Sequence, residues 1–320
     1  ELKSVIGNNM SNHLTIGVTT VRDDRDPSGD PFPAVFIDDG DGGITFGSET
    51  FSTANLLDQD IITINNNLEI YKGKHTILVG ANAEFYQTKN LFIPDNFGNY
   101  SYRRQGSFDF VGTSFLDDFL NGLPATQYSF SYGLNSSTNG DETTGAAAEF
   151  NSSQFGLYVQ DEIQANDKLK LTVGLRADIN FFEDTPGNPF FDDATKDQFP
   201  YNLRGASPGQ FIDPQVSWSP RVGFNYDVNG DRTFQLRGGV GLFTSRIPLV
   251  WPGAAYNNTG LNTGNTFRRV DLGFLGPIPD FEPDVNNQFR DIGVGEQSPS
   301  GSVDLFVEDF KVPQVLKFNV

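Results

Sequence analysis

The feature of this sequence that most constrains its fold is an unbroken alternation of apolar and polar residues from Leu169 to Phe181. A period of two places alternate side chains on opposite faces of a strand and is incompatible with a helix. At about 3.3 Å per residue the run is about 43 Å long, and tilted by roughly 45° it would cross the roughly 30 Å of a bilayer core. An apolar face towards lipid and a polar face towards water are typical of a transmembrane β-barrel strand.

Similar alternating segments recur along the chain in pairs joined by short polar turns. The predicted turns lie at residues 7–12, 72–74, 122–124, 164–167 and 229–231. Asn229-Gly230 is a strong hairpin signal, because both residues tolerate a positive φ. Together the segments predict about eleven strands, several of which begin or end in aromatic residues, as barrel strands do.

Long connections rich in Gly, Asp, Asn and Pro separate these hairpins. They cover residues 23–60, 88–106, 135–152, 183–215 and 244–311. Loops of this length are unusual in a compact domain, but an outer-membrane barrel has short periplasmic turns and long extracellular loops. The pattern therefore predicts an all-β fold, a transmembrane antiparallel up-and-down β-barrel. The turns at residues 72–74 and 229–230 should face the periplasm.

Composition narrows the class of protein further. A formal net charge of -19 argues against a nucleic-acid partner, and the absence of Cys excludes a disulfide scaffold, thiol catalysis and Cys-ligated zinc. No apolar stretch reaches the roughly 18 residues that a transmembrane helix needs. The mean hydropathy of -0.37 fits barrel strands, since half of their residues face water. Both ends of the chain lie in apparent strands, so we expect residues 1–320 to be an internal part of a longer secreted chain.

Three segments resemble the barrel of TonB-dependent outer-membrane receptors, in particular the Oar-like group. They are GLYVQDEIQANDKLKLTVGLRAD (156–178), SPRVGFNYDVNGDRTFQLRGGVGLFTSRIP (219–248) and FLDDFLNGLP (115–124), with the weaker YKGKHTILVGAN (71–82) before them. The most specific element of the resemblance is the pairing of YVQDE with GLRAD. Together the segments cover about a quarter of the chain and are spread along most of its length.

The resemblance implies a barrel of about 22 strands with a plug folded in its lumen. It also implies uptake of ligands too large for porins, driven by the TonB complex of the inner membrane. On this comparison residues 1–320 form a partial β-barrel domain, about half of the whole. The N-terminal carboxypeptidase-like and plug domains and the C-terminal strands would lie outside it, and the TonB complex would be reached through that N-terminal region.

The location implied is the outer membrane of a Gram-negative bacterium, with outer-membrane lipid as a partner. The extracellular ligand is not identified, and whether a lid lipoprotein covers the mouth stays open.

Three arginines fall on the predicted lumenal faces and are candidates for contact with a plug or a ligand. They are Arg176, Arg221 and Arg237. The alternation of residues between the two faces of each strand places Asp178, Glu162 and Gln235 on the same lumenal side, near these arginines. The alternative is a salt-bridged, hydrated wall that only solvates itself, since surface ion pairs are common and individually weak.

Two sets of loop residues are candidates for binding. The acidic residues Asp38, Asp39 and Asp41 could hold calcium, which prefers clustered carboxylates, although a solvated acidic loop is the alternative. Aromatic residues of the last loop could stack on a sugar or peptide ligand, or could form the small core that so long a loop needs. These aromatic residues are Trp251, Tyr256, Phe267, Phe274 and Phe281.

No nucleophile elbow, zinc-binding helix, phosphate-binding loop or dinucleotide fingerprint occurs in the sequence, so we expect neither enzymatic activity nor a cofactor. The sequence therefore predicts the barrel part of a TonB-dependent transporter for a peptide, a glycan or a metal chelate. An outer-membrane barrel acting as a surface structure or adhesin is the first alternative. A secreted glycan-binding β-sandwich is the second, but strands of sandwiches average about 5–6 residues.

Overall fold

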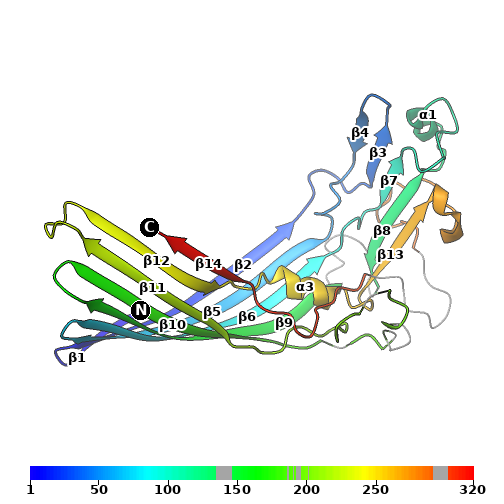
Figure 1. Ribbon diagram of the computed structural model, residues 1–320. Coiled ribbons are helices and arrows are strands. Elements are labelled where there is room, and N and C mark those ends of the chain that lie inside the picture. Colours follow the sequence, from blue (N-terminus) through cyan, green and yellow to red (C-terminus); the bar gives the residue numbers. More distant parts are fainter. Residues whose placement is uncertain (135–145, 186, 190, 192–195, 201, 291–301) are drawn as a thin grey trace.

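The computed structural model describes residues 1–134, 146–185, 187–189, 191, 196–200, 202–290 and 302–320. These residues form two β-sheets (Figure 1). The larger one, the main sheet, has nine strands, and every neighbouring pair is antiparallel. In spatial order they are β1 (Leu2–Ile6), β2 (Met10–Arg25), β5 (Asn55–Lys72), β6 (His75–Phe92), β9 (Ala148–Gln164), β10 (Leu169–Phe182), β11 (Ser217–Asp227), β12 (Gln235–Thr244) and β14 (Gln314–Asn319). The predicted antiparallel pairing in order of sequence is confirmed for this sheet.

The main sheet curves into an open trough (Figure 1). β1 and β14 are its edges, and the sheet does not close on itself within the described residues. Four short turns, at residues 7–9, 73–74, 165–168 and 228–234, lie together at one end of the trough. The long connections leave from the other end, so the predicted asymmetry between turns and loops is confirmed for the residues that the structure describes.

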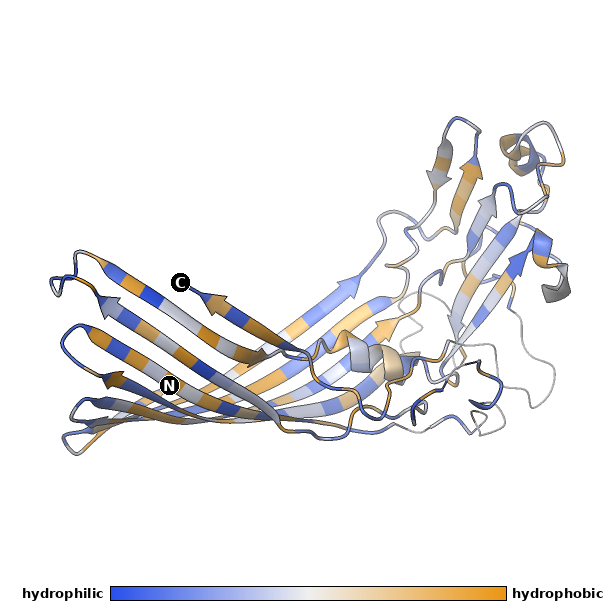
Figure 2. Ribbon diagram, in the orientation of Figure 1, coloured by the Kyte–Doolittle hydropathy of each residue, from blue (hydrophilic) through white to orange (hydrophobic). Residues whose placement is uncertain are grey.

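The sequence alternation of β10 produces two faces of opposite character. Val173 and Leu175 are 47% and 40% exposed, whereas Asp178 on the other face is 3% exposed. Alternate residues of a strand share a face, so the other predicted lipid-facing residues, Leu169, Leu171 and Ile179, lie on the exposed side. Exposed apolar residues and buried polar residues reverse the pattern of a soluble sheet and fit a strand in lipid. Figure 2 shows hydrophobic and hydrophilic residues alternating along the strands of the main sheet. A glycan-binding β-sandwich would cover this apolar face with another sheet, and no sheet formed by the described residues covers it.

Phenylalanine rings mark the end of the apolar face that lies nearer the long connections. Phe155 contacts Phe85 and Phe181 edge to face, with ring centroids 5.7 and 5.8 Å apart. One row further along the same face, Arg22 donates to both carboxylate oxygens of Asp60, at 2.9 and 2.8 Å. Aromatic residues between an apolar band and a charged one are typical of the membrane–water boundary of a barrel.

The second sheet has five strands and is built entirely from the long connections. In spatial order they are β13 (Thr263–Arg269), β8 (Gln127–Gly133), β7 (Asn99–Tyr102), β3 (Ala34–Asp38) and β4 (Gly43–Phe46). Its core is aromatic and includes Tyr100, Tyr128 and Phe130, each fully buried. The second sheet projects beyond one end of the trough (Figure 1).

The structure corrects two expectations about these strands. The segments flanking residues 122–124 were expected to form a hairpin of the barrel. Instead, the first is α1 (Phe115–Leu120), whose N-cap Ser114 accepts a hydrogen bond from the backbone N–H of Asp117, and the second is β8 of the second sheet. The expected count of about eleven barrel strands is also wrong, since nine of the described strands belong to the main sheet. Part of the predicted loop 135–152, namely residues 135–145, lies outside the described residues.

Two further helices lie wholly within described residues, namely α3 (Val250–Asn257) and the 3-10 helix η2 (Val270–Leu275). Among the described residues, no helix is both long enough and apolar enough to cross a bilayer.

Alkaline pH is expected to unfold the second sheet before the main one. Burial raises the pKa of Tyr100 to about 12 and also raises the pKa of Tyr128, whose hydroxyl donates to the backbone oxygen of Phe289. Because the pKa is higher in the folded than in the unfolded state, this stability is complete below pH 10 and falls as the pH rises towards 12. Tyrosinate absorbance and circular dichroism should therefore change together.

The matched variant is Tyr100→Phe, which removes one of these titrating groups and should move the alkaline transition to higher pH. Ionisation of the buried tyrosines near pH 10 without any loss of sheet signal would contradict the prediction.

Candidate functional site: the lumenal wall

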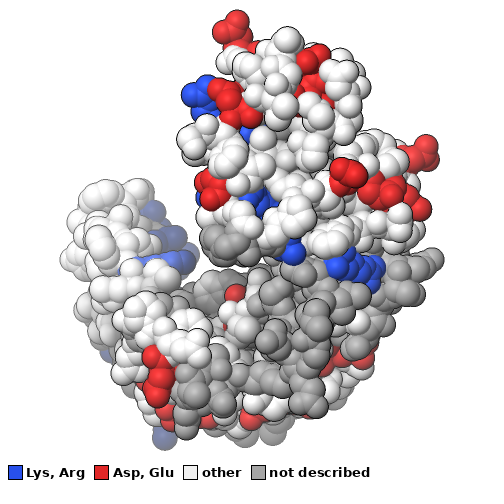
Figure 3. Space-filling view, turned by 90° about the vertical axis from the view of Figure 1, so that its right-hand side faces the viewer, with Lys and Arg blue, Asp and Glu red and all other residues white. Residues whose placement is uncertain are grey.

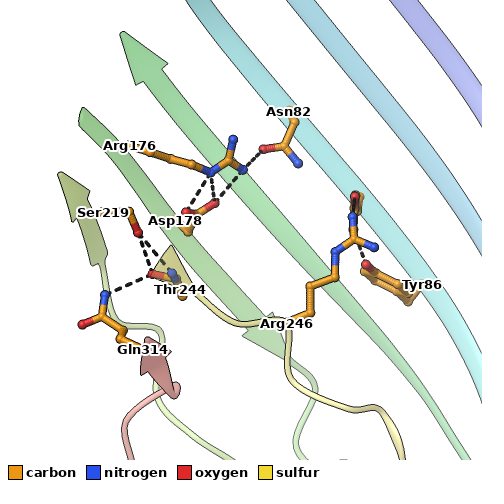
Figure 4. A network of polar contacts seen from close by, with 9 residues as sticks. Asn82, Tyr86, Arg176, Asp178, Ser219, Thr244, Arg246 and Gln314 are labelled. Atoms are coloured by element: carbon orange, nitrogen blue, oxygen red, sulfur yellow. Dashed lines mark hydrogen bonds and ion pairs between the residues drawn. The ribbon is translucent and has the colours of Figure 1, made fainter. Parts of the chain in front are cut away.

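The concave face of the main sheet, called here the lumenal wall, carries a polar network centred on Arg176. The Arg176 Nε donates to both oxygens of Asp178, each at 2.8 Å, and one terminal nitrogen donates to the side-chain oxygen of Asn82 on β6 (Figure 4). The Arg176 guanidinium also lies 5.0 Å from the ring centroid of Tyr158 on β9. The Tyr158 hydroxyl donates to Asn67 on β5 at 2.6 Å. The network thus connects four adjacent strands across the wall.

Two glycines make room for this network. A Cβ atom at Gly156 would lie 2.2 Å from both the Arg176 terminal nitrogen and the Asn82 oxygen. A Cβ atom at Gly80 would lie 2.2 Å from the Tyr158 ring. Glycine in a strand interior commonly marks such a close approach. Both glycines belong to the segments that resemble the TonB-dependent receptors, so the structure gives a packing reason for their presence.

A second polar contact lies on the same wall and comes from far along the chain. Arg246, just beyond β12, donates to the carboxylate of Glu84 on β6, and the Tyr86 hydroxyl donates to the other Glu84 oxygen (Figure 4). The Glu84 side chain is only 5% exposed, whereas that of Arg246 is 72% exposed. The parity of the predicted strand already places Glu84 on the lumenal face. Arg246 lies in a predicted loop, where parity carries no information.

The other two predicted lumenal arginines lie on the wall but do not join this network. Arg237 donates to Gln235 at 2.5 Å, as its parity predicts. Arg221 was expected near Glu162, but Glu162 pairs instead with Lys170, at 2.8 Å. Within the described residues the Arg221 Nε is buried and has no hydrogen-bond partner. Of the three predicted arginines, Arg176 alone is part of an extended network among the described residues.

The aromatic loop residues divide between packed and accessible positions. Tyr256 is 2% exposed, and its ring lies 4.8 Å from that of Phe150. Phe281 packs against the core of the second sheet, 5.0 Å from the Tyr100 ring. Trp251 is 40% exposed and Phe267 is half-buried, so both stay candidates for ligand contact. The side chain of Phe274 lies outside the described residues. For Tyr256 and Phe281 the geometry favours the alternative of a loop core.

The acidic segment forms the tight hairpin turn between β3 and β4. The Asp38 carboxylate accepts a hydrogen bond from the backbone N–H of Gly40 at 3.0 Å, while Asp39 and Asp41 are exposed. Among the described residues no group of three or more His, Cys, Asp or Glu side chains is placed to hold a metal ion, so the calcium hypothesis gains no geometric support. Figure 3 views the loop end of the molecule, where acidic side chains are spread over the projecting part.

The comparisons with known proteins agree with this architecture. A family model described as an outer membrane beta barrel domain matches residues 3–320. No curated protein and no solved structure matches the chain significantly. With an all-β fold, an apolar outer face, a charged lumenal wall and a family match over nearly its whole length, this chain belongs to the outer membrane beta barrel domain family and is located in the outer membrane of Gram-negative bacteria.

Proposed function

We propose that this chain is the barrel part of a TonB-dependent outer-membrane transporter of the Oar-like group. The observation that best supports this function is a charged, ion-paired lumenal wall on an open sheet, whose edges β1 and β14 pair with no further strand among the described residues. Unpaired strand edges are not tolerated in a bilayer, so further strands must complete the barrel. A barrel with many more than nine strands has a lumen wide enough for a large solute or a plug.

The remaining parts of the proposed transporter would come from the same parent chain. They are the C-terminal strands, a plug domain and a carboxypeptidase-like domain before it, through which the TonB complex is engaged. The proposed ligand is a peptide, a glycan or a metal chelate. Passage of such a ligand requires neither a catalytic residue nor a cofactor. A lid lipoprotein over the mouth remains compatible with this arrangement.

We assign Arg176, Arg221 and Arg237 to the face that a plug would meet. A planar guanidinium with five donors is suited to carboxylates and backbone carbonyls of a packed domain. Arg221 supports this assignment best, because its buried Nε lacks a partner among the described residues of the wall.

Energised uptake by the full-length protein tests the proposed function. Cells expressing it should accumulate one of three probes, namely fluorescein-labelled tryptic peptides, maltodextrins or a ferric catecholate chelate. Deletion of TonB should abolish that accumulation, while the amount of protein in the outer membrane stays the same. Uptake of none of the three probes, or uptake that persists without TonB, would count against the transporter.

A surface structure or adhesin is the second candidate function, and one observation favours it. Val111 and Leu120 are 81% and 71% exposed close to α1, at the far tip of the projecting second sheet. Exposed apolar residues of this kind can mark a surface for protein contact. Attachment of cells that survives deletion of TonB and is lost in a Val111→Ser/Leu120→Ser variant would favour this function.

A further inference from the structure

The connection that follows β12 crosses the inside of the trough. Residues 245–258, called here the strap, include α3, which packs against β6 and β9. Three strands, β9, β10 and β11, separate β12 from β6 in the main sheet. The strap must therefore pass over these strands to reach β6, and Figure 1 shows α3 lying over the trough near its loop end.

The strap contacts the lumenal face of the wall rather than its rim. Its Arg246 reaches Glu84, and a Cβ atom at Gly253 would lie 3.2 Å from the Cβ of Asn90. Glu84 and Asn90 share the parity of Asn82, which faces the lumen. The strap is thus attached to β6 at two points along its length.

The docking of the strap includes apolar contacts as well as these polar ones. The Tyr256 ring packs on Phe150 of β9, and its hydroxyl donates to the backbone oxygen of Glu183 at 2.5 Å. Tyr256 and Ile247 belong to a buried cluster that also contains Phe211, from the connection between β10 and β11, and Val312, just before β14. Apolar packing therefore holds the strap in place as well as its polar contacts.

The wall rows between the two attachment points carry buried polar groups that have no hydrogen-bond partner among the described residues. Thr88 and Ser152 lie on the two wall rows between Glu84 and Asn90, and they are 2% and 8% exposed. Within the part of the chain that the structure describes, their hydroxyl oxygens lack partners, as does the side-chain oxygen of Asn257 in the strap. Buried polar groups of a permanent interface are almost always paired. Hydroxyls of this kind would be satisfied by water in an open lumen.

We infer that the strap is a gate on the lumenal wall, closed by the Arg246–Glu84 ion pair and displaced when a solute passes. The inference rests on the proposed function only for the identity of the solute. This ion pair, called here the latch, joins a largely exposed side chain, that of Arg246, to a nearly inaccessible one, that of Glu84. The guanidinium is solvated again when it leaves, so the cost of opening falls on the Glu84 carboxylate, whose remaining hydrogen-bond partner among the described residues is Tyr86.

Chemical labelling of Ser152→Cys in the full-length protein tests the latch without any transport. The sequence has no Cys of its own, so this thiol is the only one in residues 1–320. A membrane-impermeant maleimide added to cells should react slowly with it. Arg246→Ala should accelerate the reaction on the order of tenfold or more, because the closed strap would then cover the Glu84 carboxylate without its counter-charge, whereas opening exposes that carboxylate to water.

Lys89→Ala is the matched control for the labelling, since it removes an ion pair with Glu149 from the opposite face of the same strand. It should leave the labelling rate unchanged. Fast labelling of the Ser152→Cys protein with an intact latch would overturn the gate, and so would an unchanged rate in Arg246→Ala.

A reversible crosslink tests the movement itself. An Asn90→Cys/Gly253→Cys pair has a Cβ separation of 3.2 Å, close to the roughly 3.5–4.5 Å of disulfides, and should join the strap to the wall on oxidation. Uptake of the TonB-dependent probe should then stop and return on reduction. The matched control is Thr172→Cys/Gly223→Cys, with 4.0 Å between the Cβ positions and both residues in the wall, which should leave uptake unchanged.

The outcomes separate the gate from the transporter. Continued uptake with the strap crosslinked, or failure of the two thiols to join under oxidation, would overturn the gate and leave the transporter standing. If no probe requires TonB, the transporter fails, and the labelling rates still decide whether the strap opens.

Discussion

Arginine in place of Leu157 is expected to prevent stable insertion of the protein into the outer membrane. The Leu157 side chain is 67% exposed on the apolar face of β9, and its strand neighbours there are Ala81 and Ala177. A charge at the centre of such a face must lie in hydrocarbon, which costs about 2–4 kcal/mol for Arg at the bilayer midplane. Heat-modifiable electrophoretic mobility of the full-length protein should show the loss of folded barrel in membranes.

Gln160 provides the matched control for this prediction, because it lies on the same strand three residues away and faces the lumen. Gln160→Arg introduces the same side chain into a hydrated wall and should leave insertion intact. Equal effects of the two variants would show that the two faces have been assigned wrongly.

Replacing Asp178 by alanine is expected to destabilise the barrel by about 3 kcal/mol, at the lower end of what loss of one partner from a buried ion pair costs. Asp178 is 3% exposed, and both of its oxygens accept hydrogen bonds from Arg176. Its loss leaves the Arg176 guanidinium, whose side chain is 26% exposed, with Asn82 as its hydrogen-bonding partner. The urea midpoint for unfolding in lipid vesicles should fall accordingly.

Two further variants separate the ion pair from simple loss of packing. Arg176→Met/Asp178→Leu removes both charges and should recover most of the lost stability, since an apolar replacement of a buried pair is often neutral. Glu162→Ala breaks the Lys170 pair, whose side chains are 42% and 38% exposed, and should cost less than about 1 kcal/mol. If the Asp178→Ala and Glu162→Ala variants unfolded at the same urea midpoint, the prediction would be wrong.

The main sheet was predictable because its information is local. In a strand with a strict period of two, odd-numbered and even-numbered residues lie on opposite faces. The alternation of residues 169–181 is therefore enough to place Arg176 and Asp178 together on the lumenal side. The short turns were also local signals. At the Asn229 turn, the Asp227 carboxylate accepts backbone N–H groups of Gly230 and Arg232, which extends the loop beyond the expected length.

The second sheet and the strap could not be predicted because their partners are distant in sequence. β3 pairs with β7 in parallel across a long connection, and strands of four to seven residues carry too few positions to reveal a period. Arg246 and Glu84 are separated by 162 residues, so no spacing rule relates them. The helix α1 was the exception, because Ser114 before two acidic residues is a local capping signal that sequence reasoning missed.

The strand order of the second sheet sets the time at which the outer surface of this protein becomes complete. The main sheet grows by pairing each strand with one of its nearest predecessors in the sheet, and four of its eight pairings are hairpins closed by short turns. β13, in contrast, pairs with β8 across more than a hundred residues, with β9 to β12 between them in the sequence. Loop-closure entropy makes such distant pairings slow. The second sheet should therefore be the last element to mature, and an antibody specific for its folded form would report the end of assembly rather than arrival at the membrane.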